Sequence, residues 1–281
     1  MKYIYISLIG LLITVTSCET QADASELLDV EELTVIHGFV SPQIDTIKIK
    51  VARSEPRFGN SDIFFKDFSI TDAVVSISRK DGREITLPYN EKSKQYEIST
   101  KDFQIIGGES YNLNVTSKGK QFAATCQVPE NTIVITSLDF VRDDEFYSAI
   151  NFKFEDVERT KNFYVAGFSY PTTNFEGFVR ETTGEQVFIT DTNKDGNLIS
   201  SSLEYYSYDI RRDTLTDFTI RLANVEPILF DYLKAISDDS DIGNPFSEPI
   251  IYPTNIEGEN SFGIFAGYTQ SERKETYNPE N

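Results

Sequence analysis

The chain has no tryptophan, one histidine, one methionine and two cysteines among its 281 residues. One histidine cannot build a multi-histidine metal centre, so any histidine-based acid–base chemistry would depend on His37 alone. Basic residues are also scarce: 26 lysines and arginines stand against 45 aspartates and glutamates, with a formal net charge of −19 and no basic run. The chain therefore lacks the electrostatic footprint of nucleic-acid binding, and we expect no nucleic-acid partner.

Residues 1–17 have the order of a secretory signal peptide. Lys2 precedes an apolar run from Tyr3 to Val15, and small residues lead to Cys18. The run is shorter than the roughly 20 apolar residues that span a bilayer, so a permanent transmembrane helix is the weaker interpretation. The sequence Val15-Thr16-Ser17-Cys18 resembles a bacterial lipobox, which predicts cleavage before Cys18 and lipidation of its sulfur.

Lipidation of Cys18 has consequences for the other cysteine and for the segment that begins at Cys18. Lipidation of Cys18 leaves Cys126 without an intramolecular disulfide partner, so Cys126 is either a small apolar strand residue or, less readily, a reactive thiol. Residues 18–31 are polar and acidic without apolar periodicity, which predicts a flexible tether. A plain spacer is the alternative.

Residues 32–130 are predicted to form an immunoglobulin-like β-sandwich. Short alternating runs, an Asp81-Gly82 hairpin signal and turn residues between the runs are typical of half-buried antiparallel strands. Tyr111 is either the tyrosine of a tyrosine corner or an ordinary core residue. Residues 55–69 are expected to be a loop that covers the sandwich or contacts a partner. The seven predicted strands are Leu33–Val40, Thr46–Val51, Ala73–Arg79, Glu84–Leu87, Gln95–Ile98, Ser110–Thr116 and Lys120–Gln127.

Residues 131–281 are predicted to form a second β-rich domain, with the boundary at Pro129. Apolar residues at helical spacing after Pro227 predict one short amphipathic helix over residues 226–237. The polar tail after Ser271 is expected to fray. The predicted strands are Ser148–Phe154, Asn162–Ser169, Gln186–Thr190, Leu203–Ile210 and Asp217–Asn224. The fold class is therefore mainly β, a sandwich followed by a second β-rich domain with one helix.

Residues 191–197 carry the sharpest motif for a metal. Asp191, Asn193 and Asp195 with Gly196 resemble the start of an EF-hand calcium loop, and the carbonyl of Asn197 would supply a further ligand. The acidic ligand expected at position 12 is replaced by serine, and the flanks are predicted strands. The alternatives are a calcium site and an Asn/Asp/Gly turn; no other cofactor is expected.

Other clusters admit a functional and a structural interpretation. The acidic runs at residues 143–145 and 238–241 are either catalytic carboxylates or solvated loops, and the latter is preferred. His37 lacks an accompanying nucleophile motif, which favours a structural role. The aromatics at Tyr205, Tyr206 and Tyr208 and in residues 174–178 suit sugar or peptide recognition, or ordinary cross-strand packing.

The C-terminal part contains an ordered set of motifs: Asp231-Tyr232-Leu233, Asn244 to Pro249, Asn255 to Gly258 and Gly263 to Tyr268. With Ala73 to Val75, Gly108 to Tyr111 and Phe122 to Ala124 upstream, these resemble the Bacteroidetes lipoprotein family catalogued as domain of unknown function 4249. Residues 258–261 depart from the double glycine that the family often has. The acidic tract after Cys18 resembles those of lipoproteins on the outer face of the outer membrane.

The resemblance implies an outer-membrane lipoprotein whose gene often lies near that of a TonB-dependent receptor, and it implies no catalytic residues. We therefore expect a non-enzymatic, lipid-anchored protein facing the cell exterior. It would bind a peptide, glycan or other small ligand, or a TonB-dependent receptor, during nutrient uptake. The alternatives are a structural or adhesive envelope lipoprotein and, after that, a hydrolase built on acidic clusters.

Overall fold

The computed structural model describes residues 32–54, 67–142, 147–173, 179–206, 215–238 and 251–278. The predicted fold class is confirmed: this part of the chain is mainly β, with α3 (Pro227–Asp238) as its only helix. The strands are β1 (Thr34–Val40), β2 (Thr46–Arg53), β3 (Val74–Arg79), β4 (Glu84–Leu87), β5 (Tyr89–Asn90), β6 (Gln95–Ser99), β7 (Ser110–Ser117), β8 (Lys120–Gln127), β9 (Ile135–Arg142), β10 (Tyr147–Glu155), β11 (Phe163–Thr173), β12 (Val179–Thr183), β13 (Val187–Thr190), β14 (Leu198–Tyr206), β15 (Thr216–Val225) and β16 (Ser261–Tyr277).

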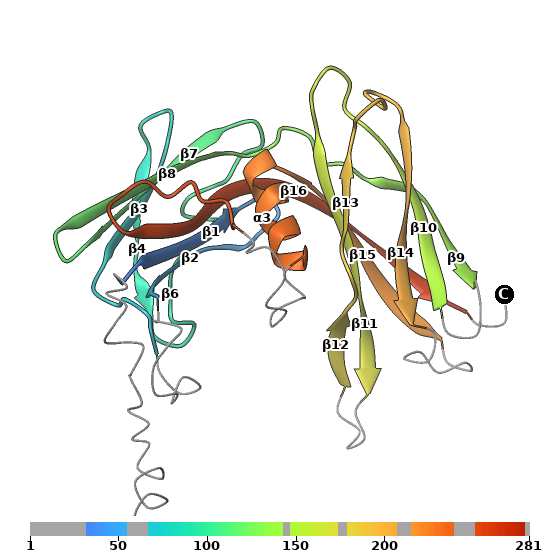
Figure 1. The fold of residues 1–281 in the computed structure, drawn as a ribbon, viewed down its shortest axis with the longest axis horizontal. Helices are drawn as coiled ribbons and strands as arrows, with labels where there is room; N and C mark the ends of the chain where they lie inside the picture. Colours follow the sequence, from blue (N-terminus) through green and yellow to red (C-terminus); the bar gives the residue numbers. More distant parts are fainter. Residues whose placement is uncertain are drawn as a thin grey trace, which may run out of the picture.

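One large sheet runs through both halves of the molecule. Its strand order is β12-β11-β15-β16-β1-β2-β6-β5, with β13 also paired to β11. A four-stranded sheet, β4-β3-β7-β8, lies against one half of it, and a three-stranded sheet, β14-β10-β9, lies against the other. Figure 1 shows the long β16 passing from the first sandwich to the second, with α3 under the middle of its arch.

The first sandwich has the alternating pattern expected from its sequence. Along β7, Tyr111, Leu113 and Val115 are buried while the residues between them are exposed. The Tyr111 hydroxyl accepts a 2.7 Å hydrogen bond from the backbone N–H of Ile106, five residues upstream, which is the contact of a tyrosine corner. The core also takes Phe265 from the far end of the chain, so the C-terminal segment helps to close this sandwich.

The second sandwich has an aromatic core. Phe218, Ile220 and Leu222 of β15 point toward the three-stranded sheet and pack with Phe152 and Phe154 of β10. The strand residues between them point the other way, because successive side chains of a strand face opposite sides of its sheet. That second face of β15 is the one that α3 covers, through Leu229 and Phe230 on the helix.

Strand β16 is shared between the two sandwiches. Residues 261–267 pair in parallel with β1, and residues 268–277 pair antiparallel with β15. The expectation that the tail frays after Ser271 is wrong, since pairing continues to Tyr277 opposite Thr216. The predicted boundary after residue 130 lies between the two cores, but β16 returns across it. Gly263 permits the parallel pairing: its φ is +122°, and a Cβ there would lie 2.0 Å from the Ile36 carbonyl oxygen.

Glu226 ties the strands together where β16 changes partner. One carboxylate oxygen accepts a 2.6 Å hydrogen bond from the N–H of Gly267, and the other accepts a 2.5 Å bond from the N–H of Gln127 at the end of β8. Burial raises the pKa of Glu226 to about 6, against the effect of these two hydrogen bonds. The carboxylate thus joins the first sandwich to the shared strand at the cost of being desolvated.

The free energy of unfolding should depend on pH because Glu226 titrates in this contact. The folded protein binds the Glu226 proton more tightly than the unfolded chain does, so the contribution of this group is largest below pH 4.5 and is lost as the pH rises through about 6. Because one pKa unit is about 1.4 kcal/mol, the loss should be about 2 kcal/mol. The Glu226→Gln substitution removes this titration.

We therefore expect the unfolding free energy of Glu226→Gln, relative to the parent protein, to rise by about 2 kcal/mol between pH 4 and pH 7 in urea titrations. Glu259→Gln removes the same charge from an exposed site and serves as the control. Parallel pH profiles for Glu226→Gln and the parent would contradict the prediction.

Candidate functional site

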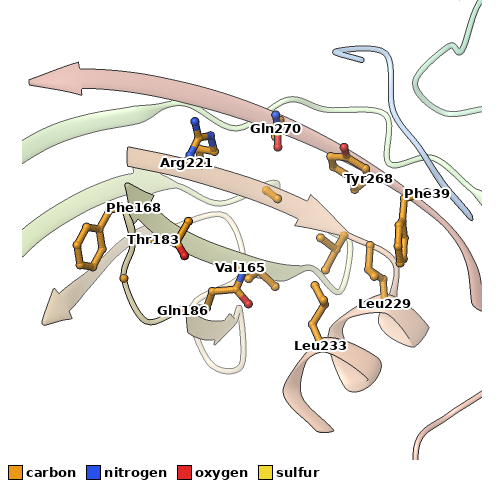
Figure 2. A pocket seen from close by; sticks show the side chains of 14 residues that line it. Phe39, Val165, Phe168, Thr183, Gln186, Arg221, Leu229, Leu233, Tyr268 and Gln270 are labelled. Atoms are coloured by element: carbon orange, nitrogen blue, oxygen red, sulfur yellow. The ribbon is translucent and has the colours of Figure 1, made fainter. Parts of the chain in front are cut away.

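A cavity of about 330 Å³ lies on the face of the large sheet that α3 covers. We call it the glycine-floored cavity. Strands β11, β15 and β16 form its floor, α3 and Phe39 of β1 form one wall, and the residues that follow β12 form the other. Figure 2 shows Leu229 and Leu233 projecting from α3 toward the space, with Arg221 and Thr183 toward its opposite end. A cavity of this size falls within the range of small-molecule sites.

Small residues on two neighbouring strands create this space. Gly167 of β11 and Ala223 of β15 both line the floor. A Cβ built on Gly167 would meet only the Gln186 side chain, at 3.5 Å, so the space above Gly167 is open. A glycine inside a strand weakens the strand and often marks a place where another group approaches the backbone. A glycine inside a strand is therefore the sequence signal for this cavity, and it was not predicted.

The two ends of the cavity differ in polarity. Tyr268, Val225 and the α3 leucines surround the helix end. At the other end Arg221 donates a 2.9 Å hydrogen bond to the hydroxyl oxygen of Ser169 and forms a 2.7 Å ion pair with Glu272. Arg221 already has an acidic partner, which offsets its positive charge. This end of the cavity therefore presents hydrogen-bonding groups to a ligand and not a free positive charge. Gln186, Gln270 and Thr183 extend the same polar end.

Two carboxylates of the predicted calcium loop come together with a third from outside the loop. Asp191 and Asp195 approach Asp156, a residue that the sequence analysis did not select, with one carboxylate oxygen from each of the three within 4.8 Å of the others. The carbonyl of Asn197 accepts the N–H of Asp156 at 3.1 Å, so it serves the backbone, and Asn193 occupies a left-handed turn position with φ of +62°. Asp156 lies in a loop 35 positions earlier in the chain than Asp191, which a local motif cannot reveal.

The three carboxylates tie two neighbouring loops. Asp191 accepts a 2.7 Å bond from the N–H of Asn162, and Asp195 accepts a 2.7 Å bond from the N–H of Arg159. Asp156 accepts the N–H of Gly196 at 2.9 Å and the hydroxyl of Tyr164. Burial, and then the hydrogen bond to Asp156, raise the pKa of Tyr164, which therefore remains a donor. Oxygen ligands of this kind also suit a hard cation such as Ca²⁺, so calcium binding stays a prediction.

The other sequence candidates have structural surroundings or lie outside the described residues. Cys126 is buried in the first sandwich, and burial raises the pKa of its thiol well above the usual value, which is the environment of an inert cysteine. Tyr205 packs in the aromatic core of the second sandwich. Cys18, the run 143–145, residues 174–178, Tyr208, most of the run 238–241 and most of the loop 55–69 lie outside the described residues.

The structure thus defines a class of β-rich protein in which two sandwiches share one sheet and a helix covers the junction. A profile of the family described as Domain of unknown function (DUF4249) matches residues 19–274. The chain therefore belongs to this family. Within the described residues, no helix is both long and apolar enough to cross a membrane.

Two solved structures that the chain is similar to are distant in sequence. The FN1–FN3 domains of chicken CNTN1 share 14% identity over 68% of this chain and 60% of that chain, with a TM-score of 0.28. The C-terminal globular domain of oligosaccharyltransferase from Pyrococcus abyssi shares 11% identity over 84% of this chain and 44% of that chain, with a TM-score of 0.16. The chain spans less than two thirds of each. No curated protein matches it.

Substitution of Asp191 should separate its two interpretations. Asp191→Ala leaves the buried N–H of Asn162 without its acceptor and should lower the unfolding free energy by about 1–3 kcal/mol, whereas Asp191→Asn keeps an acceptor and should cost less. Both decreases in the unfolding free energy are measured by urea unfolding of chelator-treated protein. Equal stability of Asp191→Ala and the parent would contradict the loop-tying role.

The same samples test the calcium prediction. Calcium binding should release heat in a titration calorimeter and raise the Tm of the chelator-treated parent, and both effects should be lost in Asp191→Asn. If the Tm of the parent is the same with calcium and with chelator, the residues 191–197 form a turn and not a calcium site.

Proposed function

We propose that this protein is a non-enzymatic, lipid-anchored surface protein of the outer membrane. It binds a small ligand in the glycine-floored cavity and acts as an accessory partner of a TonB-dependent receptor in nutrient uptake. The observation that carries the ligand-binding part is the cavity itself, formed between the shared sheet and α3. The anchor and the receptor follow from the lipobox at Cys18 and from the resemblance described above.

The chemistry of the cavity supports binding. Its described lining offers amides at Gln186 and Gln270, a hydroxyl at Thr183 and a guanidinium already paired with Glu272, next to an apolar end. A few placed polar groups beside apolar walls are typical of ligand sites, because the walls supply affinity and the polar groups supply orientation. We therefore infer a ligand with an apolar body and an uncharged polar end.

The alternative is a structural or adhesive envelope lipoprotein that uses its sandwiches as spacers. A spacer has no need of an interior glycine and alanine that keep space open beneath a helix, since filling that space would stabilise it. The cavity therefore favours ligand binding over a spacer role.

Filling the cavity provides the test. Gly167→Leu should place its side chain above the floor, while Gly167→Ala adds only a Cβ that the site accommodates. We expect saturable fluorescence enhancement of the uncharged apolar probe N-phenyl-1-naphthylamine with the parent and with Gly167→Ala, and affinity at least about tenfold weaker with Gly167→Leu. Equal fluorescence enhancement by all three folded proteins would contradict ligand binding in the glycine-floored cavity.

The membrane and receptor parts are tested separately with the tagged full-length protein. The parent should fractionate with the outer membrane and co-purify with a TonB-dependent receptor, whereas Cys18→Ala should lose the membrane association. Recovery of the membrane-bound parent without any outer-membrane receptor would count against the partnership and leave the ligand cavity untouched.

A further inference from the structure

A second cavity, of about 490 Å³, lies on the same face of the large sheet, beyond α3 from the first. We call it the basic cavity. Val35 and His37 of β1 alternate with core residues, and their side chains share one face with Phe39, which lines the glycine-floored cavity. On β2 the register partners of Val35 and His37 are Ala52 and Lys50. The basic cavity therefore uses different residues from the cavity of the proposed function.

The charge of the basic cavity is opposite to that of the protein. Its lining contains Lys50, Arg53 and Lys94 but one carboxylate, Asp67, although the whole chain carries 45 acidic against 26 basic residues. The remaining lining is apolar or neutral, with Phe68 beside Ser69 and Ser93 beside Gln95. A concave surface that concentrates one sign of charge attracts counter-ions of the other sign.

The pairing of these charges leaves an excess of positive charge. Lys94 forms a 2.7 Å ion pair with Asp67, so those two charges offset each other. Arg53 lies 3.7 Å from Glu32, and both side chains are about half exposed, which makes that pair weak. Within the described ranges Lys50 has no ion pair and no hydrogen bond. Lys50 is thus the charge that remains available.

His37 reports on that charge. Its Nε2 atom lies 2.9 Å from the Tyr232 hydroxyl of α3, and burial followed by the positive charge of Lys50 lower its pKa. The groups around the ring are Lys50 on β2, Tyr232 on α3 and the apolar Ile264 on β16, its register partner. A negative charge bound beside Lys50 would offset the effect of the lysine and raise the pKa of His37.

From this arrangement we infer that the basic cavity binds an oxyanion, the phosphate or carboxylate group of a small molecule, with Lys50 as its main electrostatic contact. Arg53 also lines the cavity, and its weak pair with Glu32 can open to the ligand. The cavity is larger than an oxyanion alone requires, so the rest of the small molecule has room beside Phe68 and the β1 side chains. Binding here is independent of the ligand proposed for the glycine-floored cavity.

The single histidine makes the test direct, because its ring resonances need no assignment. The full chain is titrated with sodium phosphate, and separately with sodium acetate, at constant ionic strength maintained with chloride. At least one of the two anions should produce a saturable shift of the His37 ring signals and raise its apparent pKa; the arm that responds identifies the oxyanion. Lys50→Met should raise the His37 pKa without anion and weaken the anion affinity at least fivefold.

Two further variants keep the result interpretable. Lys120→Met removes the same charge from the exposed start of β8 and should leave the affinity within twofold of the parent. Lys50→Gln should reproduce the loss seen with Lys50→Met, and the amide spectrum of each variant confirms that it is folded. A shift that is linear in anion concentration and equal to that in chloride, or unchanged affinity in both Lys50 variants, would overturn the inference without affecting the glycine-floored cavity.

Discussion

The pairing of β16 with both β1 and β15 is the constraint on which the rest of the structure depends. The strand enters the first sandwich in parallel beside β1 and leaves it antiparallel beside β15. Parallel neighbours cannot be joined by a tight hairpin, so this pairing unites segments more than two hundred residues apart. Gly263 makes the close approach to Ile36 sterically acceptable, and the carboxylate of Glu226 ties β8 to the strand where it changes partner.

The continuous sheet gives the molecule one face that neither smaller sheet covers. Helix α3 covers the middle of this face, packing on β11 and β16 and reaching His37 through Tyr232. A twelve-residue helix is too short to cover the face from end to end. The glycine-floored cavity and the basic cavity lie on either side of it, one with hydrogen-bonding groups beside apolar walls and one with an excess of positive charge. Residues of α3 and of the shared strand line the glycine-floored cavity, whereas the lining of the basic cavity meets α3 through the contact of His37 with Tyr232.

Local patterns predicted most of what is local in this fold. The alternation in Tyr111, Leu113 and Val115 gave a correctly placed strand, and the spacing after Pro227 gave the helix within one residue. Strand β16 was not predicted at all, and its end was expected to fray because residues 271–276 are polar on both faces: their stability comes from pairing with β15, which no local pattern records. The sites were harder still. Asp191 meets Asp156 only because two separate loops are adjacent, and Lys50 acquires its role only from its position opposite His37. Periodicity contains none of this information.

Native-state hydrogen exchange tests most directly whether the shared strand makes the two sandwiches one structure. A Cβ at Gly267 would lie 2.8 Å from the Gln127 carbonyl oxygen and from the Val128 backbone, so Gly267→Ala must separate β8 from β16 where the sandwiches meet. We expect amide exchange in β1 and β2 and in β11 and β15 to accelerate together, by at least about tenfold for each loss of 1.4 kcal/mol. Gly167→Ala, whose added Cβ meets only the Gln186 side chain at 3.5 Å, is the matched control and should leave exchange in these four strands close to that of the parent. Faster exchange confined to one sandwich in Gly267→Ala would contradict the account.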